Sequence, residues 1–150
     1  MDSTKALLLI LHVAAAALAF GASLAPSAML RRARAVGPEA LIAATREYCR
    51  QDLIGAIGGV AVFATGLALI FTGGGFAAYP PQYHAAMSLV LLMIGLGFLF
   101  LRPLGKRLVA AAEARDDSAT TKLIKRVAMG AGMMQLLWLT TLVLMFVRYF

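Results

Sequence analysis

Four long apolar runs constrain this chain more than any other feature of its sequence. They cover residues 6–30, 53–72, 83–101 and 127–147, and charged or Gly/Pro-rich segments separate them. An α-helix of about 20 apolar residues crosses the hydrocarbon core of a bilayer. Each run has about that length and is apolar around its whole circumference, as a lipid-embedded helix must be. The pattern therefore predicts an all-α membrane protein with four transmembrane helices.

The composition agrees with this fold class. Hydrophobic residues make up 61% of the 150 residues and charged residues 14%, whereas soluble domains have about 45–50% and about 25%. Four helices and their connections use the whole chain, so we expect one integral membrane domain over residues 1–150. The first run is too long and too poor in basic residues at its start for a typical signal peptide, so we expect it to remain as a helix.

The distribution of Lys and Arg predicts the orientation. In a chain with four spans the first and third connections share one side, and segments 31–51 and 102–126 together hold 12 basic residues against two, Lys5 and Arg148, on the other side. Basic connections stay in the cytoplasm. We therefore expect an up-down bundle in a bacterial inner membrane with both termini outside. Aromatic residues fit a belt at the outer interface: Phe76, Tyr79, Tyr83 and Tyr149.

The other charged and reactive residues predict no catalytic site. The net charge of +7 is concentrated at the ends of the apolar runs, so the expected partners are bilayer lipids rather than nucleic acid. Cys49, the only cysteine, is expected to be an ordinary thiol, and Asp52 is expected to cap the inner end of the second helix. Nucleotide-binding loops and nucleophile–base motifs are missing from the sequence. Without ionisable residues inside the runs, a proton relay or a coupled transporter is not expected.

Local signals refine the expected helices. Pro26 predicts a kink near the inner end of the first helix, and residues 40–48 predict a helical extension along or below the inner surface. A polar break is expected at 116–118.

Small residues recur at every fourth position at Ala17, Gly21 and Ala25, and again at Gly55 and Gly59. Such stripes let helices approach closely in lipid. We interpret them as internal packing faces, with a homodimer or a larger membrane complex as the alternative.

Two histidines are the main candidates for a functional site. His12 lies 19 residues before Arg31, and His84 lies 18 residues before Arg102. At about 1.5 Å per residue, both imidazoles are expected roughly 27–28 Å above the inner interface, near the outer edge of the hydrocarbon. Facing histidines in a helical bundle are a common way to hold a haem. The alternative is two independent structural histidines.

Sulfur and ring-bearing side chains extend this hypothesis. Counting the same number of residues from the inner interface reaches Met145 on the fourth run and residues 69–71 on the second. Met87 lies one turn from His84. Imidazole binds iron and copper, and thioether suits reduced copper. A b-type haem or copper are therefore the candidate ligands, and no ligand at all is the third possibility. Gln135 and Trp138, one turn apart, are expected either to form an interhelical hydrogen bond or to line a pocket for a ring-shaped ligand.

The remaining methionines are interpreted as core filler rather than as a copper path, since methionine packs irregular gaps well. These residues are Met93, Met129, Met133 and Met134.

Several segments resemble a group of small bacterial four-helix membrane proteins. The first run carries an early histidine (LLLILHVAAAALAFG) and then a proline before an arginine cluster (APSAMLRRAR). The second contains VFATGLALI, and the third closes in LRPLGKRL. In this outline the chain resembles copper-resistance CopD-type domains, HemJ-type protoporphyrinogen oxidases and their uncharacterised relatives, over most of its length.

The resemblance implies different functions for its branches. The HemJ-type relationship implies haem on His12, but run 83–101 contains no lysine and no Trp follows His12, so porphyrinogen oxidase activity is not expected. The CopD-type relationship implies copper uptake. Three hypotheses follow: a redox or haem-handling protein with a haem site at the outer face, a copper-binding protein that uses the same His/Met layer, and a ligand-free structural or accessory subunit.

Overall fold

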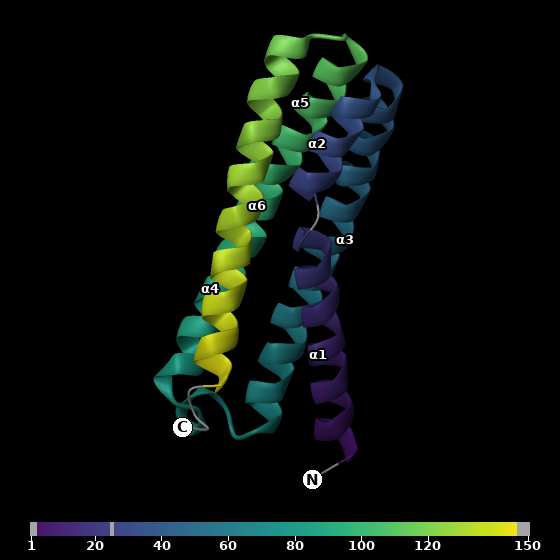
Figure 1. Cartoon of the computed structure of the whole chain (residues 1–150). Helices are drawn as coiled ribbons and strands as arrows, with labels where there is room; N and C mark the ends of the chain where they lie inside the picture. The colour runs from purple at the N-terminus through teal and green to yellow at the C-terminus, as the bar shows by residue number, and fades with distance from the viewer. Residues whose placement is uncertain (1–2, 25, 147–150) are drawn as a thin grey trace.

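A computed structural model of the chain describes residues 3–24 and 26–146 (Figure 1). Its described residues are helical apart from short connections, with no strand among them. Four helical segments are long and apolar enough to cross a membrane: Ser3–Val36, Pro38–Thr72, Pro81–Glu113 and Asp117–Phe146. The predicted class, an all-α protein with four helices of membrane-spanning length, is confirmed.

Two of these segments are divided into shorter elements. The first consists of α1 (Ser3–Leu24) and α2 (Pro26–Val36), which are separated by Ala25, a residue outside the described part, so the kink expected at Pro26 stays a prediction. The second is the single helix α3 (Pro38–Thr72), which the short helix η1 (Phe76–Ala78) follows. The third consists of α4 (Pro81–Leu96), the π-helical turn η2 (Gly97–Leu101) and α5 (Arg102–Glu113), and the fourth is α6 (Asp117–Phe146). Residues Ala25, Val147, Arg148 and Tyr149, which entered the predictions, lie outside the described residues.

The helices extend well beyond the apolar runs at one end of the molecule. α3 begins at Pro38 rather than at residue 53, and α6 begins at Asp117 rather than at residue 127. The extension predicted at 40–48 is helical, and it is continuous with the rest of α3. The prediction that Asp52 caps a helix is therefore wrong, because Asp52 lies 14 residues after the start of α3.

Tight turns connect the extended helices at this end. Gly37, between α2 and α3, has a φ of 146°, a conformation that favours glycine, and Pro38 suits the first position of a helix. Between α5 and α6, Arg115 has a φ of 54°, and the Asp116 carboxylate accepts the Ala119 N–H at 2.9 Å. The polar break expected at 116–118 lies two residues earlier, at 114–116, because Asp116 caps α6 and Asp117 begins it.

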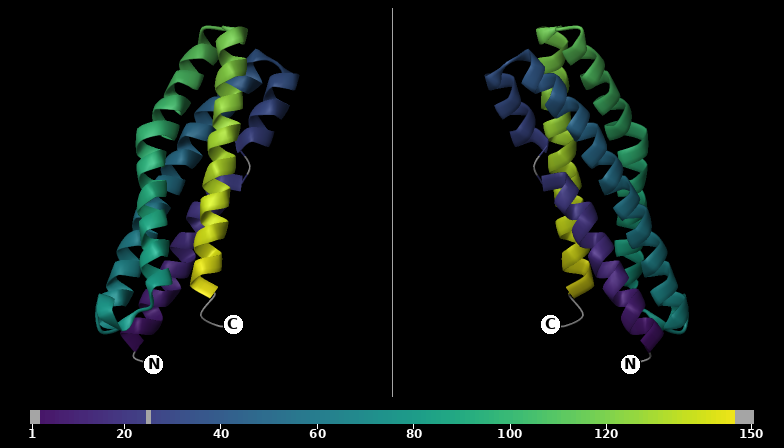
Figure 2. Two further views of the ribbon diagram at one scale, coloured as in Figure 1. Left: turned by 90° about the vertical axis from the view of Figure 1, so that its left-hand side faces the viewer. Right: turned by 90° about the vertical axis from the view of Figure 1, so that its right-hand side faces the viewer.

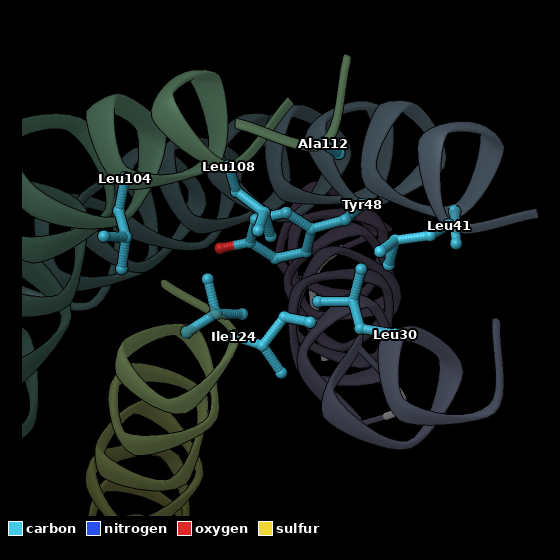
Figure 3. Packing of buried hydrophobic residues seen from close by; sticks show 9 residues of the cluster. Leu30, Leu41, Tyr48, Leu104, Leu108, Ala112 and Ile124 are labelled. Carbon is cyan, nitrogen blue, oxygen red and sulfur yellow. The ribbon is translucent and has the colours of Figure 1, made fainter. Parts of the chain in front are cut away.

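We call this end the basic end, because 12 of the 14 Lys and Arg residues lie in its two segments, 31–51 and 102–126. It also contains the larger hydrophobic core (Figure 3), in which the Tyr48 ring lies beside Leu108. Cys49 packs against this core as a free thiol. The buried residues of this core are Leu30, Leu41, Ala44, Tyr48, Leu104, Leu108, Ala112, Ile124 and Val127.

The opposite half of the molecule is packed more loosely. Its core is a small cluster of Val62, Val90 and Met93. α1 packs mainly on α3 and only slightly on α6, while α4 packs on α6 and α3. In the right-hand view of Figure 2, α1 lies alongside the lower half of α3. Ala19 is the only buried residue within the described part of α1, so this helix is attached along one narrow face.

The face of α1 that contacts α3 is not the predicted one. A Cβ added to Gly21 would meet nothing within 4 Å, and Ala17 is exposed. The contact is made by Ala19 and Ala22 instead: a Cβ at Gly58 would lie 3.0 Å from the Ala19 Cβ. The expectation for the second run holds better, since a Cβ at Gly55 would lie 3.2 Å from the Ala22 Cβ. The stripe prediction for α1 was wrong because another face of the same Ala-rich helix turns inward.

The methionine prediction is confirmed for part of the set. Met93 is buried and Met134 packs against the same cluster. Met129 and Met133 are 75% and 41% exposed, so for them the expectation of core filler was wrong. Both lie on the outward face of α6, where apolar residues need no core to pack against if lipid surrounds the helix.

Candidate functional site

His12 lies on α1 and faces α3. Its Nδ1 is 2.9 Å from the hydroxyl oxygen of Thr65. Beside Thr65, a Cβ at Gly66 would lie 3.2 Å from the Cε1 atom of the His12 ring. The missing side chain at Gly66 therefore lets the imidazole lie close against α3. The ring is half-buried, and its orientation is set by these two neighbours.

The hydrogen bonds around Thr65 determine which ring nitrogen of His12 carries the proton. The Thr65 hydroxyl donates to backbone carbonyls of its own helix, 2.7 Å to Ala61 and 3.2 Å to Val62. A hydroxyl has one hydrogen, so once it is donated the oxygen can only accept. With the hydroxyl hydrogen on the nearer carbonyl, that of Ala61, His12 donates from Nδ1, and Nε2 keeps its lone pair. This is the form in which a neutral histidine binds a metal through Nε2.

His84 is held by the connection between α3 and α4. Its Nε2 donates to the carbonyl oxygen of Phe76 at 3.1 Å, and its ring meets the Phe76 ring edge to face at 5.6 Å. In the same connection the Tyr79 hydroxyl donates to the Leu69 carbonyl at 3.1 Å, and its ring contacts that of Tyr83. His84 thus contributes to a local structure that closes this end of the molecule.

The two imidazoles have separate partners. His12 is hydrogen-bonded seven residues before the end of α3, whereas His84 is bonded to the connection that follows that end. Neither hydrogen bond joins them, and a shared ligand layer stays a prediction. Met87 and Met145 are both half-buried. Within residues 3–24 and 26–146, no group of three or more His, Cys, Asp or Glu side chains is arranged to hold a metal ion.

Gln135 and Trp138 have different roles. The Gln135 side-chain amide donates to the Ser23 carbonyl of α1 at 3.0 Å, which confirms the predicted interhelical hydrogen bond. Trp138 packs against the cluster around Val62 and Met93, and it lines an interior cavity.

This cavity has a volume of about 70 Å³ and lies between α1, α3, α4 and α6. Space of this size holds a few water molecules. Small and apolar residues form most of its walls, while Tyr48, Gln51 and Asp52 supply polar groups on the side nearer the basic end. The positive charge of Arg102 interacts electrostatically with the Asp52 carboxylate. The cavity and a half-buried carboxylate on its wall were not expected from the sequence.

One sequence signal could have indicated this wall. Tyr48, Asp52, Gly55 and Gly59 follow one another at steps of four, three and four residues, and such spacing places side chains on one face of a helix. The signal was missed because the helix was expected to begin at Asp52, so this face was divided between a connection and a span.

Comparison of the chain with protein-family models, with curated proteins and with solved structures found no match. The resemblance to CopD-type and HemJ-type proteins therefore stays a prediction based on the quoted segments.

Proposed function

We propose that the four segments cross a bacterial inner membrane as an up-down bundle, with the basic end in the cytoplasm and both termini outside. The imbalance of 12 basic residues against two supports this orientation. In this arrangement the first part of α1, the first part of α4 and the far ends of α3 and α6 lie in the outer half of the membrane. His12 then faces the interior of that half, and the connection that holds His84 lies at the outer surface.

We further propose that the protein binds a b-type haem through Nε2 of His12 and has a redox or haem-handling role. The observation that carries this proposal is the Thr65 hydrogen bond to Nδ1. A histidine that binds a metal commonly donates its other N–H to a neighbouring acceptor, which fixes the ring and the free lone pair. When bound, haem supplies one-electron chemistry at its iron; the chain supplies the ligand, the orientation and the apolar surroundings.

The surroundings of His12 suit an apolar macrocycle with acidic edges. One turn after His12, Ala15 and Ala16 pack on an apolar cluster that includes Trp138. α1 packs mainly on α3 and only slightly on α6. The macrocycle would therefore enter beside α1, on the side that does not face α3. Lys5 lies seven residues before His12 on the same side of the helix, about 10 Å away along its axis. It would pair with the haem propionates at the outer surface.

The absorption spectrum of the full chain, purified from haem-supplemented cells, tests this function. A Soret band and one iron per chain are the expected result. Stoichiometric copper without a Soret band would favour the copper hypothesis, and protein without haem or metal would favour a structural or accessory role. Porphyrinogen oxidase activity is not part of the proposal, because no lysine lies in α4 or η2.

A further inference from the structure

A groove between α2 and α6 at the basic end is lined by cationic side chains. Its volume is about 450 Å³. Arg31 and Arg34 lie three residues apart on α2, and Thr121 and Lys125 lie four apart on α6, so each pair projects from one face of its helix. Three positive charges thus converge from two helices on one space.

These charges are only weakly neutralised by the protein. α2 and the segment 117–126 contain six basic residues and one acidic residue, Asp117. Asp117 lies 3.7 Å from Arg34, but its side chain is 86% exposed, and exposed ion pairs contribute little. Within the described residues, neither Arg31 nor Lys125 has a carboxylate within 4.0 Å. The groove therefore has an excess of positive charge available to an anion.

The groove lies where two apolar runs end. Arg31 directly follows Leu30, the last residue of the first run, and Lys125 lies two residues before Val127, where the fourth run begins. In the proposed orientation this is the depth of the inner headgroups. Basic pockets between helices at that depth bind the phosphates of anionic lipids.

An exposed apolar stripe continues from the groove toward the middle of the molecule. Met129, Met133 and Leu136 follow Lys125 at steps of four, four and three residues, and they are 75%, 41% and 67% exposed. This spacing keeps them on one face of α6 above Lys125. An anion with a hydrocarbon chain would contact both the cations and this stripe, whereas a free phosphate would contact the cations alone.

We infer that the groove between α2 and α6 binds the phosphate of an anionic phospholipid, whose acyl chains lie along Met129, Met133 and Leu136. The inference is independent of the proposed haem site, which lies in the other half of the molecule. The lipid would link α2 to α6 at the basic end.

The test is a titration of the full chain in a neutral detergent with phosphatidylglycerol, followed by the rise in unfolding temperature. Wild-type protein is expected to bind phosphatidylglycerol at least tenfold more tightly than phosphatidylcholine. The double variant Arg31→Gln/Lys125→Gln should lose about tenfold or more in affinity, since each basic residue near a membrane surface contributes about fivefold. The control Lys106→Gln/Arg107→Gln removes the same charge from α5 and should stay within twofold of wild type.

Two further arms complete the test. Arg31→Lys/Lys125→Arg keeps the charge and should keep the affinity, and Met129→Asp places a carboxylate on the acyl path and should weaken binding with the cations intact. Circular dichroism verifies the helix content of each variant. Equal losses in the groove and control variants would overturn the inference, as would competition by millimolar inorganic phosphate, which would indicate a free-phosphate site.

Discussion

At the scale of single residues, hydrogen bonds hold the two histidines in different ways. His84 donates from Nε2 to the Phe76 carbonyl, and His12 donates from Nδ1 to Thr65. The bond of His84 occupies Nε2, the ring nitrogen farthest from the backbone. The bond of His12 leaves Nε2 free. A polar ring placed in apolar surroundings is costly unless it is paired, so Thr65 both lowers that cost and selects the tautomer.

Thr65→Val is predicted to weaken haem binding. Valine keeps the shape of threonine but removes the acceptor for the Nδ1–H of His12, and loss of such a supporting partner typically costs about 10–100-fold in affinity. Titration of haem into the purified variant measures the change. Thr72→Val is the matched control, because the Thr72 hydroxyl also donates to carbonyls of α3 and no bond to a histidine is found there. Equal affinity in the two variants would show that the Thr65 bond is irrelevant to the ligand.

At the scale of elements, close approach of α1 and α3 depends on a few small residues. Gly58 and Gly55 of α3 lie against Ala19 and Ala22 of α1. Between helices in lipid, dispersion contacts and backbone approach supply much of the attraction that hydrophobic burial supplies in water. Because α1 has few other neighbours, this short contact also sets the position of His12.

Gly58→Ala is predicted to destabilise the protein by about 1–3 kcal/mol, since the added methyl group would be only 3.0 Å from the Ala19 Cβ. Gly21→Ala is the control, because a Cβ there meets nothing within 4 Å; it should leave stability unchanged or raise it by up to about 1 kcal/mol. Chemical unfolding in detergent, followed by circular dichroism, measures both. Destabilisation by Gly21→Ala alone would show that the exposed face of α1 is the packed one.

Hydropathy predicted which segments have membrane-spanning length, but not where the helices end. Apolar runs mark the extent of lipid contact, whereas turns at Gly37 and at Arg115–Asp116 end the helices. The polar flanks between them remain helical because one of their faces packs into the core around Leu108. The identity of His12 as a candidate was predictable from its position in an apolar run. Its partner Thr65 was not, because the crossing of α1 over α3 decides which residues meet.

At the scale of the whole molecule, the two halves differ in how they are held together. The basic end has a continuous core of nine buried residues, and ion pairs join its helices at Arg46–Glu113 and Arg115–Glu39. The opposite half has a core of three buried residues and a loosely attached α1. This division suits the proposed function, in which the basic end is a fixed support and the other half admits a ligand.

Leu108→Ala is predicted to test where stability resides. Leu108 is fully buried at the basic end, and truncation of such a leucine typically costs about 2–5 kcal/mol. The matched control is Leu139→Ala on α6, where the leucine is 48% exposed and no core cavity would form. Unfolding free energies in detergent should differ clearly between the two variants. Equal losses would contradict a stability concentrated at the basic end.

The orientation of the molecule is predicted by its charge distribution. A reporter active only in the periplasm should be active when fused after Phe150 and inactive when inserted at Ser118, between α5 and the body of α6. The reason is that 12 of the 14 Lys and Arg residues lie in the two segments of the basic end. Activity at Ser118 with none at Phe150 would place the basic end outside and reverse the model.

The most direct test of the account is a haem titration of the metal-free protein, with His12→Ala and His84→Ala beside wild type. The account predicts one haem per wild-type chain, loss of the Soret band in His12→Ala, and a band of nearly wild-type intensity in His84→Ala, because His84 is engaged by the Phe76 carbonyl. Thermal unfolding of the two variants shows whether each remains folded. A folded His12→Ala protein that binds haem as wild type does would contradict the account.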